Sequence, residues 1–360
     1  MTEANLIQTN LPGGDIEISD PSKLPASPLV SVWMITYNHA RYIREALDSV
    51  LMQQVNFPYE ICLGEDGSND GTRETCLEYL RRYPDKIRLF LRTRDNQSRL
   101  KYRTAFMYNV VETFKAARGR YVAMLEGDDC WTSIHKLRRQ VDIFEGNDDA
   151  TVVGHYVMRT YEGSPWKSFT IPSIPIECFT LERMMRDPFY VHTSSLMLRR
   201  IEGINLDILS DAFCGDVPLT FLHLLHGHAV MAAEVMSLNR MHAGGVWAFQ
   251  PRLVQSRRVT DVWRLMKSVV PARMQEMHQL GHVRLNCELI ANLRRAHSWR
   301  EAFGYFKETM SMIGNIQHIK GIERNGLLYS AVESLCIPEL RRIRSRVFRM
   351  FSETATLNHG

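Results

Sequence analysis

The sequence lacks the features that mark several common classes of protein. Its seven cysteines include no CxxC pair, which argues against a zinc ribbon and for a reducing compartment. It has no uninterrupted apolar run long enough to cross a bilayer, and the polar residues 1–27 have no apolar core of the signal-peptide type. The GxGxxG and GxxxxGKS/T patterns of dinucleotide-binding and P-loop proteins are also missing. We therefore expect a cytoplasmic protein that binds its ligands by other means.

Charge is distributed unevenly along the chain. The net charge is +4, but residues 251–360 contain 18 Lys and Arg against 9 Asp and Glu. The basic run at 341–349 could bind anionic lipid, which would place the protein at the inner face of the cell membrane. A solvated helix face is the alternative. Nucleic acid is not an expected partner, because no recognition motif accompanies the basic residues.

Strands and helices alternate over the first 125 residues. Strands are predicted at 29–35, 59–64, 87–91 and 120–125. Helices are predicted after the first strand, after Asp70 as an N-cap, and at 102–117. This alternation is typical of an α/β fold with a Rossmann-like, mostly parallel sheet flanked by helices.

The pattern changes twice further along the chain. Between residues 150 and 250, strands are predicted at 152–158, 194–198 and 229–236, with a helix at 219–225. Beyond residue 250 the pattern is almost wholly helical. We therefore predict an N-terminal extension at 1–27, a main domain at 28–250 and a basic helical C-terminal region at 251–360.

Two acidic clusters, at 65–72 and 126–129, each follow a predicted strand. The carboxyl ends of parallel strands are where open α/β sheets bind ligands, and carboxylates there suit a hard cation with phosphate oxygens. A calcium loop starting at Asp66 is excluded because its twelfth position is Leu77 rather than Glu. A solvated acidic turn is the alternative for the second cluster. If both clusters bind ligand, they predict a site for a metal-bound nucleotide.

In order and spacing, the segments at 28–38, 65–72 and 125–131 resemble the opening strand, base-binding loop and Asp-x-Asp motif of family 2 glycosyltransferases. Residues 192–196 and 215–219 are similar to the acceptor-side segments of that family. Residues 240–247 resemble the element that closes its domain. The resemblance covers about residues 28 to 250. It implies an A-type glycosyltransferase fold and inverting transfer from a UDP- or dTDP-sugar.

The resemblance also implies roles for individual residues. Asp216 would be the general base, and Asp128 with His242 would hold Mn²⁺ or Mg²⁺. Glu126 replaces the usual first Asp of the motif, but its longer side chain can still reach. Trp131 and Trp247 would contact the acceptor or fill the core. The residues expected to bind the nucleotide are Thr36, Tyr37, Asn38, Asp66, Glu126 and Gly127.

Several alternatives remain open at this point. Asp216 could simply cap a helix, since Pro218 follows it closely. A sugar nucleotidyltransferase would need a Gly-rich, Arg-containing loop after the first strand, which is absent. A catalytically inactive nucleotide- or glycan-binding module is favoured only by Glu126. The acceptor expected for an active enzyme is a surface polysaccharide or glycolipid on a lipid carrier.

Overall fold

The computed structural model describes residues 5–162, 167–170, 178–186, 191–245, 247, 250–316 and 321–335. The chain divides into two compact units. The first comprises residues 1–181 and 190–249, and the second comprises residues 182–189 and 250–360.

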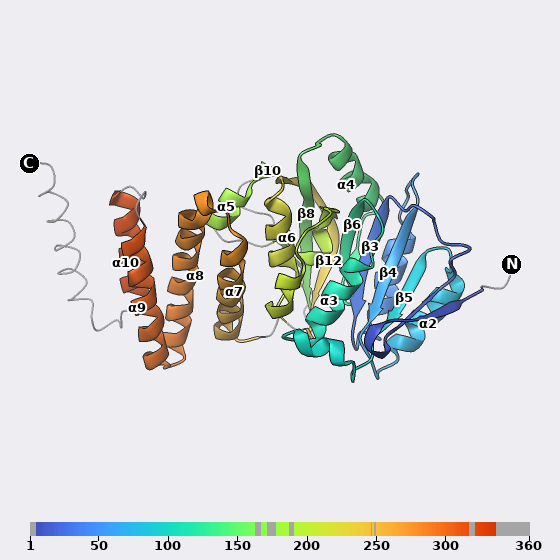
Figure 1. Cartoon of the computed structure of the whole chain (residues 1–360), viewed down its shortest axis with the longest axis horizontal. Helices are drawn as coiled ribbons and strands as arrows, with labels where there is room; N and C mark the ends of the chain where they lie inside the picture. The colour runs from blue at the N-terminus through green and yellow to red at the C-terminus, as the bar shows by residue number, and fades with distance from the viewer. Residues whose placement is uncertain are drawn as a thin grey trace, which may run out of the picture. The chain divides into compact units, whose positions relative to one another are not determined.

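The centre of the first unit is a group of four parallel strands (Figure 1). They are β3 (Val30–Thr36), β4 (Tyr59–Glu65), β5 (Ile87–Leu91) and β6 (Tyr121–Glu126), and they lie in the order β5-β4-β3-β6. The chain builds β4 and β5 on one side of β3 and then returns to place β6 on the other side. Such a reversal of strand order opens a crevice at the carboxyl ends of the strands, where ligands bind.

Further strands extend this group at both edges. Next to β6 follow β11 (Met197–Arg199), antiparallel to it, then β8 (Ala150–Tyr161) and β12 (His228–Met241), which pair in parallel. At the other edge β2 (Ile16–Ser19) pairs antiparallel with β5, so part of the predicted N-terminal extension belongs to the sheet. The remaining short strands are β1 (Ile7–Asn10), β7 (Cys130–Trp131), β9 (Lys167–Thr170) and β10 (Cys178–Phe179). The sheet is therefore mixed around a parallel centre.

Helices cover both faces of this sheet. On one face, α1 (Ile43–Leu51), α2 (Thr72–Arg82) and α4 (Lys136–Glu145) share a core with the strands. On the other, α3 (Ala105–Lys115) accepts a 3.0 Å hydrogen bond at Val110 O from Trp33 Nε1. Strands covered on both faces are mostly apolar, and every residue of β3 and β4 is buried, including the charged Glu60 and Glu65. The predicted α/β sheet flanked by helices is confirmed.

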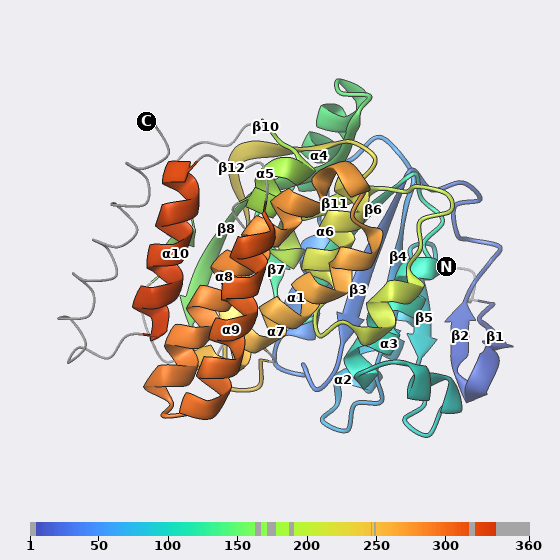
Figure 2. The same cartoon turned by 60° about the vertical axis from the view of Figure 1, so that its left-hand side comes forward.

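The second unit is helical, as predicted (Figure 2). It contains α7 (Arg252–Met266), α8 (Gln275–Arg295), α9 (Trp299–Asn315) and α10 (Gly321–Leu335). Their core includes Leu280, Val283, Ile313 and Leu327. Among the helices that the structure describes, none is long and apolar enough to cross a membrane. Shorter helices elsewhere in the chain are α5 (Leu181–Arg186) and α6 (Asp216–Leu224), with 3-10 segments at Pro12–Gly14, Gln97–Lys101, Thr193–Ser195, Asp207–Asp211, Lys267–Val269 and Ala272–Met274.

Two buried histidines on α8 make the helical unit sensitive to acid. The ring of His278 stacks on Trp263 with centroids 5.4 Å apart, and its Nε2 lies 2.9 Å from Trp263 O. His282 Nε2 has no hydrogen-bond partner among the described residues. Burial lowers the pKa of His278 to about 4 and that of His282 to about 3. Both rings are therefore neutral in the folded protein at pH 5, whereas they are protonated in the unfolded chain.

We expect acid to destabilise this unit through these groups. Because the unfolded chain binds more protons below a pH of about 6.5, stability decreases as the pH falls from there toward the folded pKa values. The loss between pH 7 and pH 5 should be about 1–2 kcal/mol per histidine. Urea unfolding followed by circular dichroism at both pH values measures it. His282→Gln should lose less stability than wild type between pH 7 and pH 5. The same substitution at the exposed His226 should lose as much stability as wild type. Equal losses in all three proteins would contradict the assignment.

Candidate active site at the switch point of the sheet

The loops that follow β3 and β4 are bound to each other. Asn38 N donates to Ser68 Oγ at 3.0 Å, and Asn69 N donates to Asn38 Oδ1 at 3.1 Å. Asn38 has a φ of 54°, which Asn tolerates better than most residues. Gly71, rather than Asp70 as predicted, occupies the N-cap of α2, although Asp70 Oδ1 accepts from Thr72 N at the start of the helix at 3.1 Å. The other oxygen of Asp70 accepts from Ala40 N at 3.0 Å and holds the two loops together.

The adjacent carboxylates Glu65 and Asp66 have different surroundings. Glu65 is fully buried and accepts from Arg73 Nε at 2.6 Å, so its role is structural. Asp66 is 4% exposed and contacts Arg99, with Arg94 Nη2 at 3.5 Å. Burial raises the pKa of Asp66 despite these two arginines. The role predicted for Asp66, accepting a hydrogen bond from a nucleobase, therefore requires this ion pair to rearrange, and it stays a prediction.

The loop after β6 lies against the end of β3. Gly127 N donates to Ile35 O at 2.8 Å. A Cβ atom at Gly127 would lie 2.6 Å from Thr36 Oγ1 and 3.1 Å from His39 Nδ1. Only glycine allows this close approach. The predicted nucleotide-binding residues Thr36 and Gly127 are thus brought together by the sheet.

Two imidazoles converge on the Asp128 carboxylate. Its Oδ2 lies 3.1 Å from His242 Nε2, which follows β12, and 3.7 Å from His39 Nε2, which follows β3. Burial would raise the pKa of Asp128, but His39 and His242 outweigh it and lower the pKa. His242 was expected here, whereas His39 was not, because one histidine after a strand carries no distinctive signal. Asp128 is therefore the ionised carboxylate of the second cluster.

Burial and like charge disfavour the ionised form of the other two carboxylates of this cluster, Glu126 and Asp129. Burial and the charge of Asp128 raise the pKa of Glu126 and of Asp129 well above the usual range. Asp129 accepts from Arg240 N at 2.9 Å and from Asn239 Nδ2 at 3.1 Å, which fixes it to β12. The charge of Asp216 also acts on Glu126. The predicted catalytic carboxylate is thus close enough to interact electrostatically with the predicted nucleotide-binding segment.

Asp216 is the first residue of α6. The N-cap is Gly215, and Asp216 Oδ1 accepts from Val217 N at 2.9 Å. Burial raises the pKa of the half-buried Asp216. A raised pKa makes a carboxylate a stronger base, provided that it is ionised at the working pH. Because Gly215 is the N-cap, the capping alternative is removed, and the role of Asp216 as a base stays a prediction.

The residues around Asp128 fit a divalent cation. Carboxylate and imidazole are ordinary ligands of Mn²⁺, and Asp128 and His242 are already within contact distance. Across the described part of the chain, no group of three or more His, Cys, Asp or Glu side chains could hold a metal ion. A cation here would therefore need ligands from outside the protein, such as phosphate oxygens and water. Its charge would also relieve the repulsion that raises the pKa of Glu126.

The two tryptophans expected at the acceptor side differ in exposure. Trp131 is 1% exposed, and its Nε1 donates to Ser194 O at 3.0 Å. Lys136 Nζ lies 3.9 Å from its ring centroid. Trp131 is therefore a core residue, and its assignment to the acceptor is corrected. Trp247 is half-buried, and its predicted contact with acceptor stays a prediction.

This part of the chain is similar to a known family and to several relatives. Residues 31–203 match the family model described as glycosyl transferase family 2. An uncharacterized protein of Mycobacterium bovis is 33% identical over 218 residues, covering 61% of this chain and 60% of the relative. An uncharacterized glycosyltransferase of Nostoc sp. is 36% identical over 126 residues, covering 35% and 36% of the two chains. The match thus spans about three fifths of the length of the first of these relatives.

Two solved structures of low sequence identity are also similar. A mannosyltransferase from Pyrobaculum calidifontis, in complex with GDP-Man and Mn²⁺, is 15% identical with a TM-score of 0.49. The similarity covers 92% of this chain and 86% of that one. TarS of S. aureus, in complex with UDP-GlcNAc, is 16% identical with a TM-score of 0.46, covering 91% and 92% of the two chains.

Proposed function

We propose that this chain is a family 2 glycosyltransferase that transfers a sugar from a UDP- or dTDP-sugar to an acceptor hydroxyl with inversion. The match of residues 31–203 to the model of that family supports the proposal. The observation that carries the proposal is the convergence of three strand ends on one place. Thr36 and Gly127 are in close approach there, Asp128 lies against His242, and the charge of Asp216 acts on Glu126.

Two residues would hold the cation on which the donor depends. Asp128 and His242 would bind Mn²⁺ or Mg²⁺, which supplies positive charge against the negative charge that develops on the leaving diphosphate. His39 lies 3.7 Å from Asp128 and orients this carboxylate from the β3 side. Arg240 is not free to bind phosphate in this arrangement, because its guanidinium donates to Asp128 O at 2.7 Å and pairs with Glu45 at 2.5 Å.

Asp216 would take the proton of the attacking hydroxyl. An inverting displacement needs one base on the acceptor side of the sugar, and the carboxylate of Asp216, at the start of α6, interacts electrostatically with Glu126. Glu126, whose pKa is raised by burial and neighbouring charge, would contact the ribose. Thr36, Tyr37, Asn38 and Asp66 would line the base and ribose.

The acceptor and location follow from the same proposal. We infer a glycan or lipid-linked acceptor and a place at the inner face of the cell membrane. The basic run at 341–349, which suggested membrane contact, lies outside the described residues. An inactive nucleotide-binding module is the second candidate, because Asp66 is held by Arg99 rather than left open.

A thermal-shift screen of nucleotides and nucleotide-sugars tests the proposal. A ligand that binds only the folded protein raises the melting temperature. UDP or dTDP and their sugars should raise it more with Mn²⁺ than without. No shift with any nucleotide would contradict both the transferase and the inactive module. A shift without any sugar transfer to a cell-envelope extract would favour the inactive module.

Gly127→Ala should weaken nucleotide binding. The new methyl group would displace Thr36 or His39, because it cannot sit 2.6 Å from Thr36 Oγ1. A displacement of about 1 Å in a site of this kind can cost about 100-fold, and we expect at least a tenfold weaker affinity for UDP with Mn²⁺, measured by calorimetry. Gly146→Ala is the control, since the nearest atom to its Cβ would be 3.4 Å away. Unchanged affinity in Gly127→Ala would exclude the loop from the site.

A further inference from the structure

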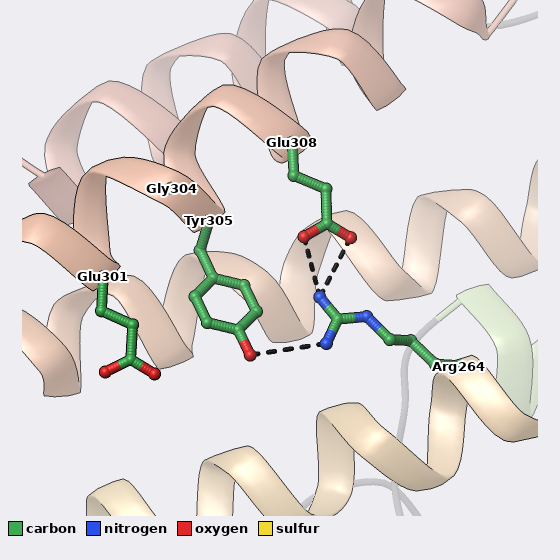
Figure 3. A pocket seen from close by; sticks show the side chains of 5 residues that line it. All are labelled: Arg264, Glu301, Gly304, Tyr305 and Glu308. Carbon is green, nitrogen blue, oxygen red and sulfur yellow. Dashed lines mark hydrogen bonds and ion pairs between the residues drawn. The ribbon is translucent and has the colours of Figure 1, made fainter.

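One side of helix α9 packs against the rest of the second unit. Ala302, Thr309 and Ile313 are buried. Next to them, three polar residues project from α9 toward Arg264 of α7 around a pocket (Figure 3). Arg264 Nη2 donates to Glu308 at 2.8 Å, and Arg264 Nη1 donates to Tyr305 Oη at 3.4 Å. Glu301 pairs with Arg257 at 2.6 Å. Both acidic residues of α9 are thus neutralised on this side.

The other side of α9 carries aromatic and basic residues. Trp299 is 40% exposed and Phe303, one turn later, is 49% exposed. Phe303 stacks on Phe306 with centroids 6.2 Å apart, and Lys307 Nζ lies 4.9 Å from the Phe303 ring. Arg300 and Lys307 are exposed beside the two aromatic rings. The two acidic side chains of α9, Glu301 and Glu308, are 40% and 41% exposed, but each pairs with an arginine of α7.

We propose that this surface, defined by Trp299, Arg300, Phe303 and Lys307 and called here the α9 face, binds an anionic lipid surface. Large aromatic rings are favoured at the boundary between headgroups and acyl chains, and Lys and Arg beside them attract anionic headgroups. The stems of Arg300 and Lys307 can lie along the apolar boundary while their charged ends reach phosphate. A helix so placed lies in the plane of the membrane and does not span it.

The composition of the α9 face favours lipid over a second copy of the chain. A stable protein interface buries about 1,200–2,000 Å² in total, and like charges that meet across it are unfavourable. Two aromatic side chains framed by two cations offer little area, and a copy of the same face would bring like charges together. The proposal concerns where the protein binds and does not depend on the transfer chemistry at Asp216.

Sedimentation of the full chain with lipid vesicles tests the proposal. We expect wild type to sediment with vesicles of phosphatidylcholine and phosphatidylglycerol, and not with phosphatidylcholine alone. Each basic side chain at an anionic surface contributes about fivefold to the partition. Arg300→Glu with Lys307→Glu should therefore weaken sedimentation about 25-fold or more. Trp299→Ala with Phe303→Ala should weaken it on the same vesicles without any change of charge.

A matched control separates the α9 face from net charge. Arg81→Glu with Arg82→Glu changes the net charge equally at exposed positions of α2 and should leave sedimentation within about twofold. Equal losses in both charge-reversal variants, or wild-type binding by both α9 variants, would overturn the proposal. So would a doubling of mass in light scattering without lipid that the α9 variants abolish. The thermal shift with UDP and Mn²⁺ should be the same in all of these variants, which separates failure here from failure of the proposed function.

Discussion

Asp216→Asn should reduce sugar transfer by about 10²–10⁴-fold, the usual contribution of a positioned general base. The amide keeps the size of the carboxylate and can still accept from Val217 N, which now donates to Asp216 Oδ1 at 2.9 Å. It cannot take a proton from the acceptor hydroxyl. The loss should therefore appear in kcat, while the affinity for the donor nucleotide stays close to that of wild type.

The rate is measured as transfer from the donor that the thermal-shift screen selects, with a cell-envelope extract as the source of acceptor. Asp211→Asn is the matched control, because Asp211 is an exposed residue five positions upstream. A rate in Asp216→Asn equal to that of the control would show that another group accepts the proton. The N-cap role cannot explain a large loss, since Gly215 occupies that position.

Asp128→Asn should remove most of the dependence of transfer on divalent metal. A bound cation contributes several kcal/mol to a transition state that carries growing negative charge, which corresponds to roughly 10³-fold in rate. The variant keeps the shape of the side chain but removes the charge that His39 and His242 face at 3.7 and 3.1 Å. We expect both the rate and the apparent affinity for Mn²⁺ to fall.

Titration of the rate with Mn²⁺ measures this loss in wild type and in the variant. Asp142→Asn, at an exposed position of α4, removes the same charge away from the site and should behave like wild type. His242→Ala should fall between the two, because it removes one of the two proposed ligands. Wild-type activity in Asp128→Asn at low Mn²⁺ would exclude Asp128 as a ligand.

Much of the fold could be predicted from the sequence because its strongest patterns are local. The apolar strands β3, β4, β5 and β6 and the helices between them have clear periodicities, and all are present. The short strands β1, β2 and β7 were not predicted, because strands of two to four residues are too short to show a periodicity. The antiparallel pairing of β11 depends on contacts distant in the chain.

The part of the site that could be predicted is the part marked by clusters of charged residues at strand ends. Asp128 and His242 meet as expected, although 114 residues separate them. His39 and Arg99 were missed, because an isolated basic residue gives no signal until the fold places it beside a carboxylate. The acceptor role predicted for Trp131 was wrong, because the sequence around a tryptophan next to an acidic motif is the same whether its side chain is exposed or in the core.

The account depends most on a metal-assisted nucleotide site at Asp128, and calorimetric titration of UDP with and without Mn²⁺ tests that claim most directly. We predict that Mn²⁺ tightens the binding of UDP to the wild-type protein by roughly 5–150-fold, the usual range for two coupled ligands. The same titration of Asp128→Asn should show no such enhancement. Identical UDP affinities with and without Mn²⁺ in the wild-type protein would contradict the account.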